Sequence, residues 1–252
     1  CVICHSEDAA LSNSGVVNLG FISTRLGLRG ISGESEYARV LRDIEVARRT
    51  KSPVHIAHVS CRKSIEIIAQ AKKKGVAVTC ETAPHYIALT EEDVLGYDTN
   101  FKMNPPLRSR DDRDAIRQGL KDGVIDAIAS DHAPHTENEK DIEFDRAAFG
   151  VVGLETALSI VITELIDTGI LDWNRLVRLM CQNPADIVGV DAGRLAKGKD
   201  ADIVILDPDA SWVVSKETLV SKSKNSPFMG KTLKGKVLYT ICKGKRAYTA
   251  NA

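Results

Sequence analysis

Histidine and aspartate side chains follow three short apolar stretches of this chain, and their types are those that bind a catalytic metal ion. His5 follows residues 2–4, His58 follows residues 54–57, and Asp131 follows residues 125–130. Neutral imidazole and carboxylate are ligands suited to Zn²⁺ or a similar divalent ion. We therefore interpret His5, His58 and Asp131 as ligands of a metal that activates a water molecule.

Hydrolysis is the chemistry expected of such a site. A bound metal brings the pKa of water down to ~7. The Asp131 carboxylate could then take a proton from that water and pass it to a leaving nitrogen. Plainer interpretations exist, since His5 could be a satisfied core residue and Asp131 could cap the next helix. Their joint occurrence at three strand ends favours a functional site, and three ligands could hold one metal.

A second histidine, His55, lies three residues before His58. Side chains alternate between the faces of a strand, so His55 and His58 should point in opposite directions. Only one of them can point into a barrel, and His58 is nearer the carboxyl end. We therefore assign the ligand to His58.

The elements that position these residues are expected to alternate between strand and helix up to about residue 150. Apolar periodicity predicts helices over 34–50, 62–74 and 110–121 and strands over 2–4, 54–59, 76–80 and 124–130. Residues 12–34 are interpreted as a loop rich in Gly and Ser. The alternation predicts a parallel sheet with right-handed crossovers. About four strands are counted where a closed (β/α)₈ barrel needs eight, so the sequence indicates the later half of a barrel.

The remainder of the chain changes in character. Two helices are expected over about 153–168 and 172–188, with Pro184 interrupting the second, and short strands follow from residue 193. We divide the chain into a partial barrel, 1–190, and a C-terminal β module, 191–252, that completes a small β-sandwich domain.

Composition limits the kinds of partner. The 252 residues include 34 Lys and Arg against 34 Asp and Glu, which favours neither nucleic acid nor a membrane surface. No apolar run approaches the ~20 residues of a membrane span. The six cysteines are scattered, and Cys1 and Cys4 form a CxxC by spacing with no second pair nearby. We therefore interpret the cysteines as free thiols of a reducing cytoplasm. Because the chain opens on Cys1 inside a strand, we expect it to be the later part of a longer protein.

Further polar and glycine residues surround these strand ends. Asn104 and Arg108 offer donors suited to carboxylates or amides. The plainer interpretation is a turn with a solvated arginine. His135 could contact a substrate or lie at the surface, and Gly150 could allow a close backbone approach or be an ordinary turn residue. No role is forced for His85.

Taken together, these segments closely resemble dihydroorotase, a cyclic amidohydrolase of pyrimidine synthesis. The matching segments are His5-Ser-Glu-Asp8, His55-Ile-Ala-His58-Val-Ser60, Glu81-Thr-Ala-Pro-His85, Lys102-Met-Asn-Pro-Pro-Leu-Arg108, Asp131-His-Ala-Pro-His135, Phe149-Gly-Val-Val-Gly-Leu-Glu155, Asn183-Pro-Ala185 and Ser221-Lys-Ser-Lys-Asn-Ser-Pro-Phe228. Hydantoinases and allantoinases share the metal scaffold but differ at the Asn-Pro-Pro-Leu-Arg and Asp-His-Ala-Pro-His segments.

The resemblance implies the second half of a metal-dependent-hydrolase TIM (β/α)₈ barrel with a binuclear zinc centre. It implies the reversible hydrolysis of L-dihydroorotate to N-carbamoyl-L-aspartate in de novo pyrimidine (UMP) biosynthesis. By the same resemblance, His5 and His58 match ligands of one metal, while Asp131 matches the aspartate that binds the other and shuttles the proton. Contacts to the substrate match Asn104, His135 and the backbone of Phe149 and Gly150.

The chain departs from the family pattern in one respect. The family's His-x-His metal pair, its bridging acidic ligand or carboxylated lysine, and the arginine that grips the substrate carboxylate belong to earlier strands. We therefore expect two Zn²⁺ per intact site with further ligands upstream, and no activity from this chain alone. The expected partner is a small-molecule substrate, with a homodimer or an association with aspartate transcarbamoylase as the protein partners to consider.

Two other functions remain as alternatives. The first is a cyclic amidohydrolase of the hydantoinase or allantoinase type. The second is a non-catalytic dihydroorotase-like subunit that serves as a scaffold. Such a subunit should have lost ligands, whereas His5, His58 and Asp131 are all present.

Overall fold

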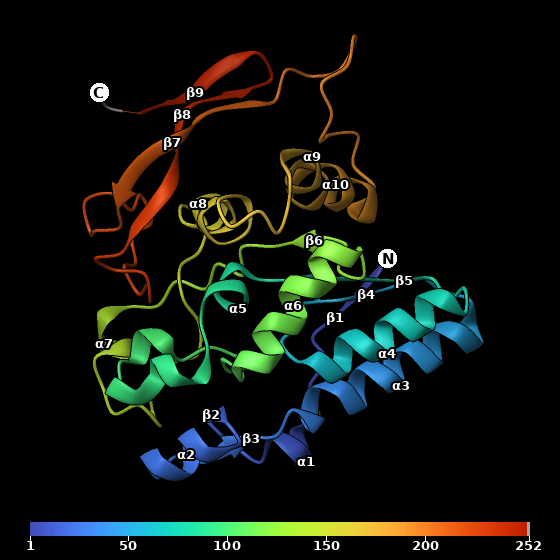
Figure 1. The fold of residues 1–252 in the computed structure, drawn as a ribbon, viewed down its shortest axis with the longest axis vertical. Coiled ribbons are helices and arrows are strands. Elements are labelled where there is room, and N and C mark those ends of the chain that lie inside the picture. The colour runs from blue at the N-terminus through green and yellow to red at the C-terminus, as the bar shows by residue number, and fades with distance from the viewer. Residues whose placement is uncertain (251–252) are drawn as a thin grey trace.

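Four parallel strands form the central sheet of the computed structural model, which describes residues 1–250. Their order is β1 (Val2–Cys4), β4 (Val54–Ile56), β5 (Val78–Thr82) and β6 (Ala127–Ile128). The main helices between them are α3 (Glu34–Thr50), α4 (Arg62–Lys73) and α6 (Arg110–Asp122). Helix α3 packs against α4, and α4 packs against α6, in the order of the strands (Figure 1). The predicted four-stranded parallel sheet is confirmed.

The long helices follow from their apolar spacing and their ends. In α3, Val40, Ile44 and Ala47 recur at helical spacing and are buried against the sheet. Leu41 lies beside this stripe and is 56% exposed. Helix α6 begins where the Ser109 side chain accepts the Asp112 N–H, and it ends at Gly123, whose φ is 81°.

All four strands run in the same direction, so their carboxyl ends meet at one edge of the sheet. Cys4 pairs with Ile56, and Ile56 pairs with Cys80, while β5 continues into pairing with β6. His5 therefore follows directly on the last residue of β1. The edge beyond these strand ends is where active sites of parallel barrels lie.

The outer edge of β1 is unpaired within residues 1–250, because β4 is its one sheet neighbour there. Val2 and Ile3 on this strand are 62% and 58% exposed, whereas all three residues of β4 are buried. A parallel strand is usually apolar throughout and buried on both faces. Strand β1 thus has the apolar composition of a buried strand, but two of its residues are exposed to solvent.

Several predicted bounds are wrong for identifiable reasons. Strands predicted over 54–59 and 124–130 stop at Ile56 and Ile128, because His58 and Asp131 adopt left-handed conformations with φ of 37° and 46°. The strand predicted over 76–80 lies at Val78–Thr82.

The region predicted as a loop over 12–34 contains regular structure. It holds a parallel pair, β2 (Val17–Asn18) and β3 (Gly30–Ile31), and helix α2 (Phe21–Leu26). Two-residue strands are too short to show a hydrophobic period, so they cannot be predicted from the pattern of residues. A Cβ on Gly30 would lie 2.5 Å from the Leu19 Cα, which explains why glycine occupies this close crossing.

Shorter helices connect the main elements. They are α1 (Ala9–Ser12), α5 (Pro84–Ala88), η1 (Glu91–Gly96), η2 (Thr99–Phe101) and α7 (Glu137–Lys140). The helix predicted over 153–168 consists of α8 (Ala157–Val161) continued by a π-helical segment, η3 (Ile162–Ile166).

The helix predicted over 172–188 also contains a π-helical segment. It runs through α9 (Trp173–Val177), η4 (Arg178–Gln182) and α10 (Asn183–Val188). Pro184 stands in the first turn of α10, directly after the π-helical turn of η4. The proline therefore follows the wider turn instead of breaking the helix.

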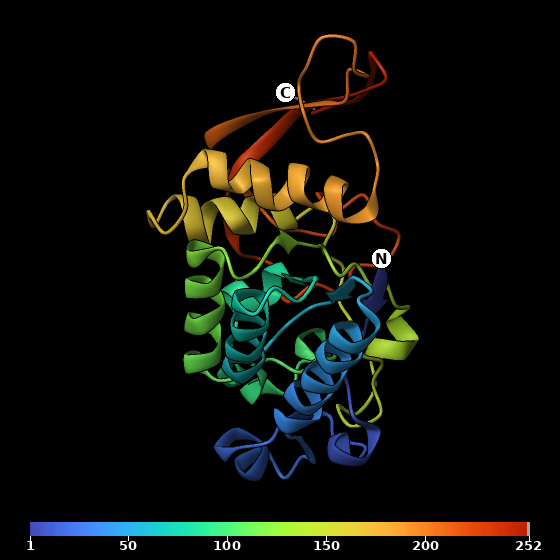
Figure 2. The ribbon, with the colours of Figure 1, turned by 90° about the vertical axis from the view of Figure 1, so that its right-hand side faces the viewer.

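A three-stranded antiparallel sheet follows the helices, in the order β7 (Ile203–Val213), β8 (Thr232–Cys242) and β9 (Lys245–Thr249). Figures 1 and 2 show it at one end of the molecule, beyond α8 and α10. The Ser159 hydroxyl of α8 donates to the Gly235 carbonyl and accepts from the Trp212 indole, which fixes the sheet to the helix. The domain division at 190/191 stays a prediction.

No helix among residues 1–250 combines the length and the apolar character needed to cross a membrane.

Candidate active site

Two histidines from neighbouring strands face each other at the carboxyl edge of the sheet. Nδ1 of His5 lies 2.9 Å from Nε2 of His58, and the two rings meet edge to face. The left-handed backbone at His58 turns the chain out of the line of β4. Tetrahedral zinc with Zn–N bonds of ~2.0–2.1 Å separates two ligand nitrogens by roughly 3.3 Å. The pair therefore fits two positions of a metal site after a small opening.

Asp131 lies three residues beyond the end of β6, on the same edge of the sheet. Its Oδ2 is 3.6 Å from Nε2 of His85, a buried nitrogen that has no hydrogen-bond partner. Burial raises the pKa of Asp131; the charge of His58 opposes this rise and that of Glu81 adds to it. Burial also lowers the pKa of His58. Thr136 caps α7, so the plainer interpretation of Asp131 as a helix cap is wrong.

The three predicted ligands do not close around a single ion. Among residues 1–250, no group of three or more His, Cys, Asp or Glu side chains converges closely enough to hold a metal. His5 and His58 face one another, whereas the carboxylate of Asp131 lies nearest to His85. The two imidazoles therefore lie in one place and the carboxylate in another, and the assignment of His5, His58 and Asp131 as metal ligands stays a prediction.

A carboxylate that sequence reasoning left without a role joins the histidine pair to the loop after η2. Oε2 of Glu7 accepts hydrogen bonds from Nε2 of His5 and from Nδ2 of Asn104, each at 2.8 Å. Burial acts to raise the pKa of Glu7, but the hydrogen bonds from His5 and Asn104 hold it below its ordinary value. The motif His5-Ser-Glu7 is the signal that could have found it.

His135 and the Phe149–Gly150 backbone lie together, as the sequence grouped them. Nε2 of His135 donates to the Phe149 carbonyl at 2.8 Å, and the Gly150 N–H donates to the Lys102 carbonyl at 2.9 Å. Both backbone groups therefore already have partners within the chain. Gly150 has a φ of 124°, and a Cβ there would lie 2.5 Å from the Ala133 Cβ, so the close approach is to the chain itself.

Two buried lysines support this cluster, and neither was singled out from the sequence. Nζ of Lys140 donates to the carbonyls of Ala148, Gly150 and Lys102 at 2.8, 3.0 and 3.4 Å. Nζ of Lys102 donates to the Asp145 carbonyl and stands 4.4 Å from the centre of the Phe149 ring. Burial lowers the pKa of each lysine to about 8.

Two further histidines, His55 and His132, contact other groups of the protein and do not face the His5–His58 pair. Nδ1 of His55 lies 2.8 Å from the Thr79 hydroxyl, and Nε2 lies 3.4 Å from the Glu81 carboxylate. Nδ1 of His132 accepts the backbone N–H of Gly153 at 3.1 Å. His55 thus faces β5 instead of His5, in agreement with the choice of His58.

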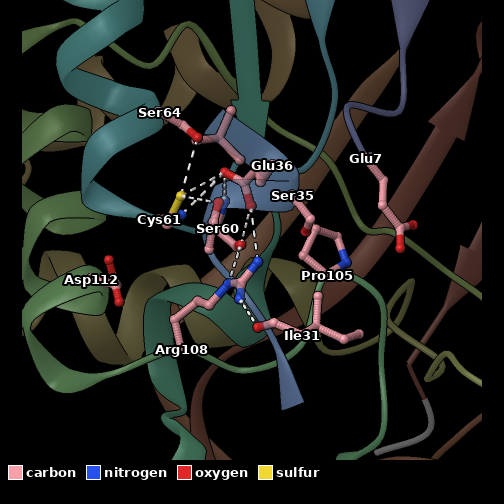
Figure 3. A network of polar contacts seen from close by, with 12 residues as sticks. Glu7, Ile31, Ser35, Glu36, Ser60, Cys61, Ser64, Pro105, Arg108 and Asp112 are labelled. Atoms are coloured by element: carbon pink, nitrogen blue, oxygen red, sulfur yellow. Dashed lines mark hydrogen bonds and ion pairs between the residues drawn. The ribbon is translucent and has the colours of Figure 1, made fainter. Parts of the chain in front are cut away.

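Arg108 points toward Ser60, Glu36 and Ile31 within the protein, as Figure 3 shows. It is 4% exposed, and its guanidinium donates to the Ser60 hydroxyl, the Asn18 side chain and the Ile31 carbonyl. Nη2 lies 3.7 Å from the buried carboxylate of Glu36, which itself accepts the backbone N–H of Ser60. Both earlier interpretations of Arg108, a substrate donor or a solvated side chain, are wrong. The guanidinium ties together the segments that follow β4 and η2.

Replacing Arg108 by Met in the whole protein should lower the free energy of unfolding by about 3 kcal/mol, because it removes one partner of a buried charged pair. The measurement is urea unfolding. The matched control is Arg110→Met, since Arg110 is 68% exposed beside Glu92 and should change stability by under about 1 kcal/mol. Unchanged stability with weaker substrate binding in Arg108→Met would instead assign Arg108 to the substrate.

Parallel strands whose carboxyl ends are followed by histidine and aspartate are typical of the barrels of metal-dependent hydrolases. The model of the amidohydrolase family matches residues 28–247, and the chain belongs to that family. Members of this family are generally metal-dependent, and a small-molecule substrate is consistent with the family.

The curated relatives include dihydroorotases from several bacteria. One from Geobacter metallireducens is 54% identical over 247 residues, which cover 98% of this chain and 58% of the relative. One from Elusimicrobium minutum is 52% identical over 244 residues, which cover 97% of this chain and 56% of the relative. The chain thus spans a little over half the length of the curated relatives it matches.

Solved structures agree on the fold. The L-hydantoinase of Arthrobacter aurescens matches with a TM-score of 0.89 at 27% identity, over 98% of this chain and 56% of that one. The dihydropyrimidinase of Brevibacillus agri matches with a TM-score of 0.86 at 25% identity, over 98% and 56%. The predicted fold class, part of an amidohydrolase TIM barrel followed by a small β module, is confirmed.

Proposed function

We propose that the whole protein is a dihydroorotase, which hydrolyses L-dihydroorotate reversibly to N-carbamoyl-L-aspartate. The observation that carries this proposal is the placement of His5, His58, Asp131 and Asn104 at one edge of a parallel sheet in a chain more than 50% identical to dihydroorotases. The hydantoinase alternative has weaker support, because the matching hydantoinase structure is 27% identical to this chain.

The reaction adds water across a ring amide. The water oxygen bonds to the ring carbonyl carbon, the C–N bond breaks, and the ring nitrogen gains the proton that water loses. Asp131 is the group proposed to take that proton and deliver it to nitrogen. Its burial and raised pKa suit a carboxylate that must be protonated between the two steps.

His5 and His58 would hold one metal ion, and Asp131 would contribute to holding a second. When bound, such an ion supplies a water molecule of lowered pKa at neutral pH. Among residues 1–250 no group of three or more His, Cys, Asp or Glu side chains is placed to hold a metal, and we propose that the further ligands implied by the family resemblance come from a preceding segment. We propose zinc as the metal, two per site, on the grounds of the imidazole donors and the family resemblance.

Asn104 and His135 are proposed to orient the ring. Arg108 is committed to Ser60 and Glu36, so it does not grip the substrate carboxylate. That contact is proposed to come from His135 and from an arginine of the preceding segment.

The whole protein should open dihydroorotate and be poor on dihydrouracil and hydantoin, which lack the carboxylate. We expect kcat/KM to differ by about 10²-fold or more, because a site built for a charged group leaves its donors unpaired with a neutral ring. The measurement is steady-state hydrolysis of the three rings by the zinc-loaded protein. A preference for the uncharged rings would support the hydantoinase alternative.

A further inference from the structure

We propose that Glu7 is a positioning residue that orients both His5 and Asn104, and so couples metal binding to substrate recognition. This inference rests on the proposed function. Glu7 lies in the loop between β1 and α1, two residues after His5. One carboxylate oxygen, Oε2, accepts from Nε2 of His5 and from Nδ2 of Asn104, both at 2.8 Å. It therefore joins side chains from two segments that are far apart in the sequence.

The contact with His5 selects the form of the imidazole ring. A carboxylate only accepts hydrogen bonds, so Nε2 of His5 must carry the hydrogen. In the neutral ring the lone pair then lies on Nδ1, the nitrogen that faces Nε2 of His58 at 2.9 Å. A nitrogen that binds a metal must present its lone pair, and a carboxylate on the other nitrogen is the usual means of fixing it.

The contact with Asn104 selects the orientation of its amide. Because Nδ2 donates to Glu7, the carbonyl oxygen Oδ1 points away from the carboxylate and remains able to accept a hydrogen bond. Without Glu7 the amide could turn over and present either group. Removal of Glu7 should therefore disturb the proposed substrate contact as well as the proposed metal ligand.

Glu7→Gln in the whole protein separates this role from a purely structural one. Glutamine has nearly the size and shape of glutamate, so the substitution opens no cavity at this partly buried position. The Kd for Zn²⁺ alone, measured by competition with a chelator, should rise by about 10–100-fold. With zinc saturating, the KM for dihydroorotate should also rise. A wild-type zinc Kd in Glu7→Gln would overturn the proposal.

The matched control is Glu91→Gln. Glu91 is likewise a partly buried carboxylate that accepts from an asparagine, Asn18 at 2.6 Å, but it contacts no histidine. Its replacement should leave the zinc Kd unchanged. An equal loss of zinc affinity in both variants would overturn the specific role of Glu7.

A measurement on the wild-type protein needs no variant. Nitrogen-15 NMR of the metal-free protein should show neutral His5 with its hydrogen on Nε2, and a hydrogen on Nδ1 would overturn the proposal. The two proposals also fail separately. Weaker zinc binding in Glu7→Gln without any turnover of dihydroorotate by the wild type would sink the proposed function and keep the role of Glu7. Turnover of dihydroorotate by the wild type, with unchanged zinc binding in Glu7→Gln, would keep the proposed function and overturn the role of Glu7.

Discussion

Replacing Asp131 by Asn in the whole protein should lower kcat/KM for dihydroorotate by about 10²–10⁴-fold, the usual contribution of a general acid–base group. The amide keeps the size and one oxygen of the carboxylate, but it cannot accept a proton from water or pass it to the ring nitrogen. Asp131 follows β6 in a left-handed backbone conformation, and burial raises the pKa of its carboxyl group. Neither feature assigns the carboxylate a purely structural role. The measurement is steady-state kinetics at saturating zinc.

The control for this prediction lies at the other end of the same strand. Asp126 precedes β6, and its carboxylate binds Nζ of Lys72 and the backbone N–H of Cys80. Residues at the amino ends of barrel strands serve stability, so Asp126→Asn should lower stability and leave kcat/KM within a few-fold of wild type. If Asp131→Asn also stays within a few-fold, the acid–base assignment of Asp131 is wrong.

The candidate site could be predicted from the sequence where one element positions one residue. His5 directly follows β1 as predicted, Asp131 lies three residues beyond β6, and alternation chooses His58 over His55. Contacts between distant segments could not be predicted. Whether Arg108 faces a ligand or the buried Glu36 depends on how two separate loops pack, and local spacing carries no information about that.

The same distinction applies to the fold. Helices α3 and α6 were placed within one residue, because their length gives a readable apolar period and Gly123 supplies a stop signal. Strands β2 and β3 have two residues each and owe their pairing to the packing of neighbouring segments. The π-helical segments η3 and η4 were also missed, since the sequence pattern does not distinguish a π-turn from an α-turn.

The isolated 252-residue chain should aggregate, bind zinc weakly at most, and show no dihydroorotase activity. Within the described residues, the edge of β1 away from β4 is unpaired and offers free N–H and C=O groups, and Val2 and Ile3 of this strand are 62% and 58% exposed. Such an edge is a template for pairing with another chain. His5 and His58 alone offer too few ligands to supply folding energy through metal binding. Light scattering, zinc titration and an activity assay test the three expectations.

Two additions to this experiment separate the causes. A Val2→Lys, Ile3→Lys variant should aggregate less, because charged side chains blunt a sheet edge, yet it should still lack activity, since the missing ligands are not restored. Joining the chain to the segment proposed to precede it should restore solubility, zinc binding and turnover together. A soluble, monomeric 252-residue chain that hydrolyses dihydroorotate would refute the prediction. Residues 1–250 would then have to form a complete metal site, whereas their present arrangement brings together two ligands, His5 and His58.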